Sequence, residues 1–600
     1  MLFDAARGCK STKGDVCGTM SWEKLCVNNT YLARSNFTLW WIHLNNYMLG
    51  KRGSHWGKEN FYFQDGKMLL NSKLLLGFLV LGFAIGCQKN AEQNRNESPK
   101  TAVIGLTGDF DTFLELATAN SDALHVIEEM LFLTLCELDD ALNLQPRLAK
   151  SWQTSADGKE ITFTLRDEVL WSDGQPVTAE DVLFTYQLAV NPQVGYTGRA
   201  RFAEVDTAIV LDPQTIRFTF KKNYPEALLD LQIPILPKHI LASVPAEQIR
   251  QCAFNRQPVG NGPFALKEWR ANDRAVFEAN ERYFAGKPKL DRVVFRIVPD
   301  ETVLISSALT GDIDLLPYVA PNRLTEIDHQ PEVRLLKYPD RGYSFLAFNL
   351  NRPVFQDRRV RQGVAKAIQR QNLINVLLNG NGRLIPGPIP PYFWAYDETL
   401  PVDIFNPDEA EDLLDLAGWI DKNGDGVRER AGKPLEFTMK TNADNKLRSD
   451  ALVMMQADLE KVGVKARPEL LEFGKLVEDV LQRRDFDTVL LSWKTGYAVD
   501  PSQVWHSDAI QNGYNLISYR NPRVDSLLVV ARQEADRGKA KPLWGAFQRL
   551  VAEDCPYVFL YNQENPAVVR ERLQNVKMDM RGYLINIEAW TVEETKIAKL

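Results

Sequence analysis

The 600-residue sequence has few of the residues that catalytic and metal sites need. None of the four histidines beyond residue 100 has a second histidine or a cysteine at ligand spacing. The sequence contains no His-Glu-x-x-His, no Gly-x-Ser-x-Gly and no complete phosphate-binding loop. These absences argue against a zinc hydrolase, a serine hydrolase and a nucleotide-binding enzyme. A pair of carboxylates brought together by folding, as in a glycosidase, stays open.

Cysteine is also scarce, and the cysteines are widely spaced. Beyond residue 87 there are only Cys136, Cys252 and Cys555, which allow one disulfide at most and form no metal-ligand cluster. The net charge is −7 without a block of basic residues, so nucleic acid and anionic membrane surfaces are not expected partners. With 45% apolar and 25% charged residues, a chain of this length is expected to fold into two or more globular lobes.

One apolar run stands near the start of the chain, and it is shorter than an ordinary membrane span. After a short basic start at Met68–Lys73, the apolar run at 74–85 has about a dozen residues, whereas a spanning helix needs ~20. The run ends in Ala84-Ile-Gly-Cys87, which resembles a bacterial lipobox, in which the cysteine becomes the lipidated N-terminus. The pattern predicts a lipoprotein signal peptide with Cys87 as the lipidation site. A buried helix or a single span is the alternative.

The most informative stretch is Ser151–Tyr186. An Asp157-Gly158 turn precedes residues 159–166, where apolar and polar side chains alternate, which predicts a strand with one buried face. Thr178, with Asp181 three residues later, predicts a capped helix start. As a string, these residues resemble the N-terminal signature of the family 5 extracellular solute-binding proteins, the peptide and nickel receptors of ABC importers.

Further segments resemble the same family, in the expected order. Pro258-Val-Gly-Asn-Gly-Pro-Phe264 through Gly311-Asp-Ile-Asp314 is similar to the second family segment, and Val504–Leu528 to the C-terminal lobe pattern. The buried-type strand Gly342–Asn349 resembles the family's hinge strand, and Pro556–Tyr561 resembles the strand that returns across the hinge. The resemblance covers about residues 101–595.

The resemblance implies an α/β protein with the type II periplasmic-binding-protein fold, in which two lobes are joined by a two-strand hinge and the first lobe carries an inserted subdomain. The expected division is 1–67 as a non-native N-terminal extension, 68–87 as the lipoprotein signal peptide, 88–100 as a flexible tether, 101–344 as lobe I with the inserted subdomain at about 130–250, 345–561 as lobe II, and 562–600 as the return to lobe I.

The resemblance also implies a function. The chain would be the substrate-binding lipoprotein of an ABC importer, which captures peptides or a related small solute in an interlobe cleft and delivers it to a permease and ATPase complex. It would be an exported monomer without cofactor, held by lipid at the periplasmic or outer face of a bacterial envelope. A ligand-sensing lipoprotein without a transport role and a secreted hydrolase are the alternatives.

The expected cleft residues lie on two strands and the loop after one of them. The strand at 487–493 ends in a Gly-containing loop that places Trp493, Tyr497 and Asp500 at the edge of a lobe, and the hinge strand adds Tyr343 and Asn349. An ordinary core tryptophan beside a solvated loop is the alternative interpretation.

One position in this loop departs from the family. In peptide-binding members, an aspartate three residues after this tryptophan pairs with the α-ammonium group of the peptide. Here that residue is Gly496, and the next acid is Asp500. The ligand could therefore be a blocked peptide, another small solute, or a peptide held mainly by backbone pairing.

A second loop resembles half of a calcium site. Asp421, Asn423 and Asp425 alternate before Gly426, but the twelfth loop position is Gly432, where calcium would require a bidentate glutamate. The sequence therefore favours a connector of Asx turns.

Hydrophobic periodicity predicts the remaining elements. Those used below are a strand at 102–106, a helix around 122–135, a hairpin at 206–221, and a strand, helix and strand at 435–440, 449–462 and 487–493.

Overall fold

The structure, a computed structural model, describes residues 99–223 and 225–593, which belong to one compact unit. The predicted extension 1–67, the signal peptide 68–87 with Cys87, and nearly all of the tether 88–100 lie outside the described residues. Within the part that the structure describes, no helix has the length and hydropathy to cross a bilayer.

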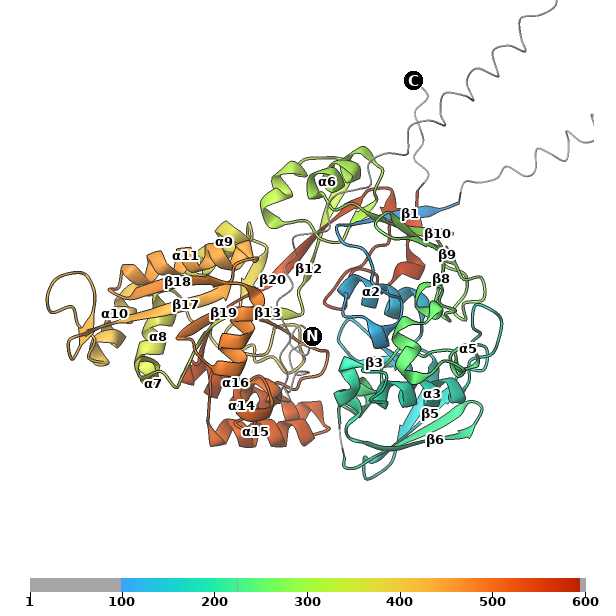
Figure 1. The fold of residues 1–600 in the computed structure, drawn as a ribbon, viewed down its shortest axis with the longest axis horizontal. Coiled ribbons are helices and arrows are strands. Elements are labelled where there is room, and N and C mark those ends of the chain that lie inside the picture. Colours follow the sequence, from blue (N-terminus) through green and yellow to red (C-terminus); the bar gives the residue numbers. More distant parts are fainter. Residues whose placement is uncertain (1–98, 224, 594–600) are drawn as a thin grey trace, which may run out of the picture. The chain divides into compact units, whose positions relative to one another are not determined.

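A twelve-stranded mixed sheet organises the fold, and the 14-residue strand β20 (Tyr557–Arg570) belongs to both of its halves (Figure 1). Its first part pairs antiparallel with β13 (Gly342–Phe348), and its last part pairs with β12 (Val333–Pro339). Because only residues 340 and 341 separate β12 from β13, two continuous stretches of chain join the two halves. This is the two-strand hinge expected from the family resemblance.

The predicted lobe boundaries fall inside these strands. The boundary at 344/345 coincides with an irregularity in the register of β13 against β20, between Ser344 and Phe345. The boundary at 561/562 lies where β20 stops pairing with β13 and begins to pair with β12, whose partners start at Glu564. The division into segments stays a prediction.

The lobe I half of the sheet has the order β11-β1-β10-β9-β8. Strand β1 confirms the strand predicted at 102–106, and it runs parallel to β10. The strands are β1 (Thr101–Leu106), β8 (Phe264–Arg270), β9 (Arg274–Ala279), β10 (Arg292–Ile297) and β11 (Leu315–Leu316).

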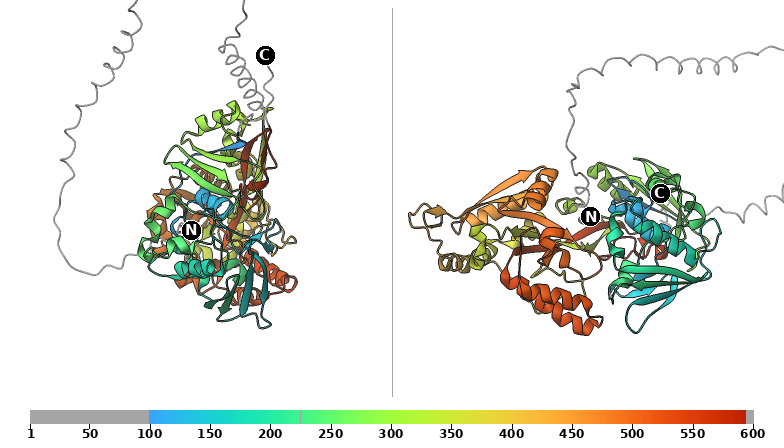
Figure 2. Two further views of the ribbon diagram at one scale, coloured as in Figure 1. Left: turned by 90° about the vertical axis from the view of Figure 1, so that its right-hand side faces the viewer. Right: turned by 60° about the horizontal axis from the view of Figure 1, so that its bottom comes forward.

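A separate four-stranded antiparallel sheet lies within the range predicted for the inserted subdomain, and it is teal in Figure 2. Its strand β5 (Glu160–Leu165) buries alternate residues, as predicted. The predicted hairpin is also confirmed, and the backbone N–H of Thr178 donates to Asp181 Oδ2 (2.9 Å) at the start of the predicted helix. The other elements are β4 (Ala149–Thr154), β6 (Val205–Asp212), β7 (Thr215–Phe220) and α3 (Ala179–Val190).

The helix predicted around 122–135 ends earlier. It consists of α2 (Ser121–Val126) and a π-helical turn, η3 (Ile127–Leu131), and the chain is then extended. The glycine-rich turn before β8 causes this end, because the backbone N–H groups of Asn261 and Gly262 donate to Leu131 O (3.0 and 2.9 Å). A Cβ on Gly260 would lie 2.1 Å from the same oxygen, so this glycine allows the close approach.

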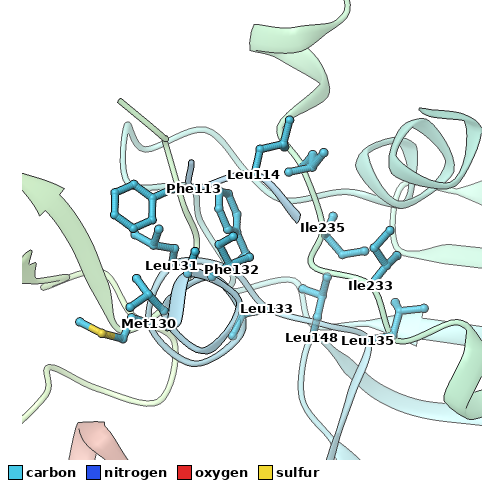
Figure 3. Packing of buried hydrophobic residues seen from close by; sticks show 14 of the residues in the cluster. Phe113, Leu114, Met130, Leu131, Phe132, Leu133, Leu135, Leu148, Ile233 and Ile235 are labelled. Atoms are coloured by element: carbon cyan, nitrogen blue, oxygen red, sulfur yellow. The ribbon is translucent and has the colours of Figure 1, made fainter. Parts of the chain in front are cut away.

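Apolar side chains around this helix end form the centre of the lobe I core. Figure 3 shows Phe113, Leu131, Phe132 and Ile235 among the apolar side chains of this cluster, and all four are buried. Residues 132–135 are extended and all buried, so their successive side chains pack into the core on both sides of the segment. A continued helix would not allow this. Tertiary packing overrides the local helical pattern here.

The lobe II half has the strand order β18-β17-β19-β13-β20. The predicted strand, helix and strand are confirmed as β17 (Glu436–Asn442), α11 (Lys446–Glu460) and β19 (Thr488–Lys494), and β18 (Lys465–Leu471) follows α11 (Figure 1). β17 runs parallel to both β18 and β19. The carboxyl ends of β17 and β19 therefore lie at the same edge of the sheet.

Helices cover both faces of this half. Leu346 belongs to an apolar cluster with α8 (Arg358–Ala367), α10 (Pro407–Leu416) and α11, whereas its neighbour Phe345 belongs to a cluster with α15 (Pro522–Gln533) and α16 (Arg537–Asp554). Because neighbouring residues of a strand point to opposite faces, the two clusters lie on opposite sides of the sheet.

Shorter elements complete the described chain. They are β2 (Cys136–Leu138), β3 (Leu144–Pro146), α4 (Ala227–Asp230), α5 (Lys238–Leu241), α6 (Glu301–Thr310), α7 (Pro353–Gln356), α9 (Arg370–Leu377), β14 (Gly382–Leu384), β15 (Glu429–Arg430), β16 (Lys433–Pro434), α12 (Phe473–Val477), α13 (Ser502–Trp505), α14 (Ala509–Asn512), β21 (Leu573–Gln574) and β22 (Thr591–Val592).

The loop at 421–426 contains the predicted Asx turns. Asp421 accepts the backbone N–H groups of Gly424 (2.7 Å) and Gly426 (2.9 Å), and Asn423 accepts that of Asp425 (2.9 Å). These hydrogen bonds hold the loop in the conformation that the sequence favoured.

The three cysteines in the described part of the chain are free thiols. Cys136 and Cys555 are buried, and burial raises the pKa of each thiol to about 12. The one disulfide that the count allowed does not form between them.

Candidate ligand-binding site

A cavity of about 330 Å³ lies in lobe II, at the edge where β17 and β19 end. This volume falls within the range of ~300–1,000 Å³ that is typical of small-molecule sites. Most of its walls are apolar or aromatic. The aromatic side chains that line it are Tyr343, Phe393, Phe473, Trp493, Trp505 and Tyr514.

Three of the five predicted cleft residues line this cavity: Tyr343, Trp493 and Asp500. The Trp493 ring stacks on Phe345 with its centroid 5.6 Å away and its plane tilted by 21°. Because Phe345 is fully buried on β13, the sheet fixes one face of this tryptophan. Trp493 is therefore a rigid part of the cavity wall.

Tyr497 does not line the cavity, although it belongs to the same loop. Its ring lies under the guanidinium group of Arg341, 4.7 Å from the ring centroid, and its hydroxyl donates to Arg581 O (3.4 Å). Burial raises the pKa of this hydroxyl, so it remains a neutral donor. The side chain thus holds the loop against Arg341, between β12 and β13, and against Arg581 near the C-terminal end of the described chain.

Asn349 does not lie in the cavity either. It is 1% exposed, and its amide group donates to Arg484 O (3.0 Å) and Phe486 O (2.8 Å). Its side-chain oxygen accepts the N–H of Asn351 (3.1 Å). Because its hydrogen-bonding groups already bind the backbone, we assign Asn349 to holding β13 against the start of β19 and not to ligand binding.

Three charged residues line the cavity, and two of them are neutralised by the protein. Lys494 forms an ion pair with Asp340, which lies between β12 and β13. Asp500 pairs with Arg532 (3.2 Å) and accepts the N–H of Ser502 (3.1 Å).

The third charged residue, Arg448, differs. Its Nη1 donates to Asn442 Oδ1 (2.8 Å), and no carboxylate of the described residues lies within ion-pair distance of it. Burial lowers its pKa, and Tyr561 and Asp444 oppose this effect only in part. Arg448 is thus a partly desolvated cation at the cavity wall.

The sequence patterns did not single out Arg448, Trp505 or Phe393 as site residues. For Arg448 a signal was present. The predicted strand, helix and strand imply parallel pairing, and ligands of open α/β sheets bind beyond the carboxyl ends of the strands. Arg448 stands in the first turn of the helix that follows such an end. Trp505 and Phe393 come from segments whose approach to this edge depends on tertiary packing.

Gly496 also lines the cavity. A Cβ built on it would meet nothing nearer than Ala498 N at 4.0 Å, so the backbone leaves room for a side chain. The lack of an acid at this position is therefore not required by packing.

A second group of charged residues lies in lobe I. Glu115 accepts the Tyr196 hydroxyl (2.6 Å) and lies 3.5 Å from Arg201. Burial, reinforced by the negative charges of Glu115 and Glu129, raises the pKa of Glu128 on the π-helical turn to about 8. Among the described residues, no group of three or more histidine, cysteine or acidic side chains is arranged to hold a metal ion.

The sequence matches the bacterial extracellular solute-binding proteins, family 5 Middle, over residues 143–515. It is 30% identical over 533 residues to the oligopeptide-binding protein AppA of Bacillus subtilis (strain 168), which covers 86% of this chain and 98% of that protein. It is 25% identical over 462 residues to the dipeptide-binding protein of Escherichia coli (strain K12), which covers 73% of this chain and 84% of that protein.

Solved structures have the same architecture. The structure of AppA from Bacillus subtilis in complex with a nonapeptide has a TM-score of 0.67 at 29% identity and covers 83% of this chain and 100% of its own. NikZ from Campylobacter jejuni in complex with Ni(L-His) has a TM-score of 0.68 at 26% identity, with 82% and 99% covered. The fold is that of type II periplasmic binding proteins, and the chain belongs to family 5 of the bacterial extracellular solute-binding proteins.

Proposed function

We propose that this protein captures a peptide or a related small solute and delivers it to the permease of an ABC importer. The observation that carries the proposal is the lobe II cavity, which has rigid aromatic walls and lies beside the hinge strand that supplies Tyr343. Aromatic walls with few charged groups suit side chains of varied shape. Relatives that are named as peptide-binding proteins support the peptide class.

Capture would involve closure of the two lobes about the hinge. Contacts of lobe II with lobe I that favour a closed form include Arg537, whose Nη1 donates to Asn143 Oδ1 (2.8 Å), and Tyr497, which donates to Arg581 O (3.4 Å). A ligand that contacts both lobes stabilises the closed form in proportion to its differential affinity for the two states.

The protein would act as a receptor without catalysing a reaction. Of the described residues that line the cavity, Asp500 is the single acid, and it is paired with Arg532. A glycosidase needs two carboxylates within ~5–10 Å of each other at its site.

Native mass spectrometry of the purified protein tests the proposal. We expect a small molecule to co-purify and the same molecule to raise the melting temperature, because binding to the folded state stabilises it. Failure to find a retained molecule, together with an unchanged melting temperature across a panel of peptides, metal complexes and sugars, would contradict the receptor function.

We also propose that Cys87 carries a lipid that holds the protein at the outer face of a bacterial membrane. The motif Ala84-Ile-Gly-Cys87 after a short apolar run supports this proposal. Cells expressing the wild-type chain should incorporate labelled palmitate into it and keep it with the membrane fraction. Cys87→Ala should abolish both, and a labelled Cys87→Ala protein would refute the assignment.

A further inference from the structure

We propose that Arg448 pairs with a carboxylate of the ligand, whose apolar or aromatic body occupies the adjoining cavity. This inference rests on the proposed function and specifies the chemistry of the ligand. It concerns one end of the ligand, and the carboxylate can belong either to a peptide's C-terminus or to an acidic side chain.

The charges at the cavity wall are balanced unequally. Lys494 and Asp500 have partners in Asp340 and Arg532, so neither needs a ligand to neutralise it. Arg448 has no carboxylate within ion-pair distance among residues 99–223 and 225–593. A partly buried cation without an ion-pair partner is costly, and Asp444, which acts on Arg448 from a longer distance, offsets this cost only in part. An anion from the ligand would remove the remaining cost.

Asn442 orients the guanidinium group of Arg448. Asn442 is 5% exposed at the end of β17, and its side-chain oxygen accepts Arg448 Nη1 (2.8 Å). Its amide donates to Asp444 Oδ1 (2.5 Å), so the orientation of the Asn442 amide is itself fixed. Asp444 lies beyond ion-pair distance of Arg448 and offsets the effect of its burial only in part.

The guanidinium group of Arg448 has N–H donors to spare. A guanidinium group has five N–H donors in a planar fork, which matches the two oxygens of a carboxylate. One hydrogen bond from the Arg448 side chain is found within the described chain, and the group lines the cavity. The remaining donors suit a bidentate contact, and the aromatic rings beside them suit an apolar substituent on the same ligand.

Four synthetic probes test the inference by calorimetric titration of the purified full-length protein. Ala-Phe-Phe as free acid and as C-terminal amide tests a terminal carboxylate. Ala-Glu-Phe amide and Ala-Gln-Phe amide test an acidic side chain. We expect the acid of one pair to bind at least about tenfold more tightly than its neutral partner, because a desolvated charge pair is lost in the neutral probe. The pair that shows the difference identifies the source of the carboxylate.

Variants then assign the effect to Arg448. Arg448→Met should remove the preference for the acidic probe and leave the affinity for the neutral probe within about threefold, and Arg448→Lys should keep part of the preference. Arg467→Met is the matched control, because Arg467 is exposed on β18 and pairs with Glu436. The probe pairs on the wild-type protein remain decisive if Arg448→Met does not fold.

Each outcome decides the question. Equal affinity for the acid and its neutral partner in both pairs overturns the role of Arg448 and leaves peptide binding intact. If no probe binds, these tripeptides are not ligands, and the ligand extracted from the purified protein decides. An extracted ligand without an acidic group overturns the inference. An acidic extracted ligand supports it only if Arg448→Met no longer retains that ligand while Arg467→Met does.

Discussion

Arg448 and Asp500 line the same cavity, but their charges are balanced differently. Asp500 already has Arg532 as an ion-pair partner and the N–H of Ser502 as a hydrogen-bond donor, whereas Arg448 is held by a neutral amide. A charge that the protein has neutralised contributes little to ligand binding, while an unbalanced one attracts an opposite charge. We therefore expect the acidic side of the cavity to contribute structure and the basic side to contribute selectivity.

The largest effect should come from the wall that both sides share. Trp493→Ala removes a ring that stacks on Phe345, and we expect the affinity for every ligand to fall by ~30–100-fold, as for a buried aromatic anchor. Calorimetric titration with the extracted ligand measures the loss. Trp152→Ala, a half-buried tryptophan on β4 away from the cavity, is the control. Comparable losses in both variants would show that the effect is not local to the cavity.

The next effect tests whether the acidic side can be made selective. Gly496→Asp places an unpaired carboxylate where peptide-binding relatives are expected to have one, and the backbone leaves space for it. We expect peptides with a free amino group to bind ~10-fold more tightly than before, because a new charge pair forms in a partly enclosed site. N-acetylated peptides should be unaffected, and the neutral Gly496→Asn is the matched control. A gain that is equal for acetylated and free peptides would contradict this reasoning.

A smaller effect should follow from removing the charge that the protein already balances. We expect Asp500→Asn to change the affinity for ligands with a free amino group by about threefold or less, because Arg532 and not the ligand is its partner. Titration of the variant with a peptide and its N-acetylated form measures this. A tenfold loss confined to the free amine would show that the ligand displaces Arg532.

The smallest effect on binding is expected in lobe I, where Glu128 lies outside the cavity lining. Its pKa of about 8 in the folded state lies above the ordinary value of 4.5, so the folded protein keeps this proton longer than the unfolded chain. The contribution of Glu128 to the free energy of unfolding should therefore fall as pH rises from about 4.5 to 8.

Glu128→Gln removes this dependence. The free energy of unfolding of the variant, compared with that of the wild type, should be higher at pH 8 than at pH 5 by on the order of 1–2 kcal/mol. Ligand affinity should be unchanged. Urea unfolding at the two pH values measures the difference, and Glu398→Gln, an exposed residue, is the control. A variant that is no more stable than the wild type at pH 8 would contradict the raised pKa.

Much of the fold could be predicted from local patterns. The alternation at 159–166, the cap formed by Thr178 and Asp181, and the strand, helix and strand at 435–493 all occur as predicted, because each depends on neighbours a few residues away. The end of the first helix could not be predicted, because Leu131 O accepts hydrogen bonds from a turn about 130 residues later.

The candidate site divides in the same way. Trp493 and Asp500 line the cavity, and local patterns could place them there because Trp493 lies near the end of a recognisable strand and Asp500 in the loop after it. Asn349 also stands at a strand end, but its side chain turns into the protein and binds backbone carbonyls, which no local pattern indicates. Tyr497 belongs to the right loop, yet its neighbours Arg341 and Arg581 come from distant segments.

By itself, the sequence determined the family, the two-lobed α/β fold and the absence of an aspartate at Gly496. Only the tertiary structure decided which charges are satisfied. Lys494 meets Asp340 because β19 pairs antiparallel with β13, and Arg448 meets Asn442 because α11 begins just after β17 ends. Asp500 meets Arg532 because the loop after β19 packs near α15. Ion pairing depends on distances of a few ångströms, and folding leaves Arg448 without a carboxylate at ion-pair distance among the described residues.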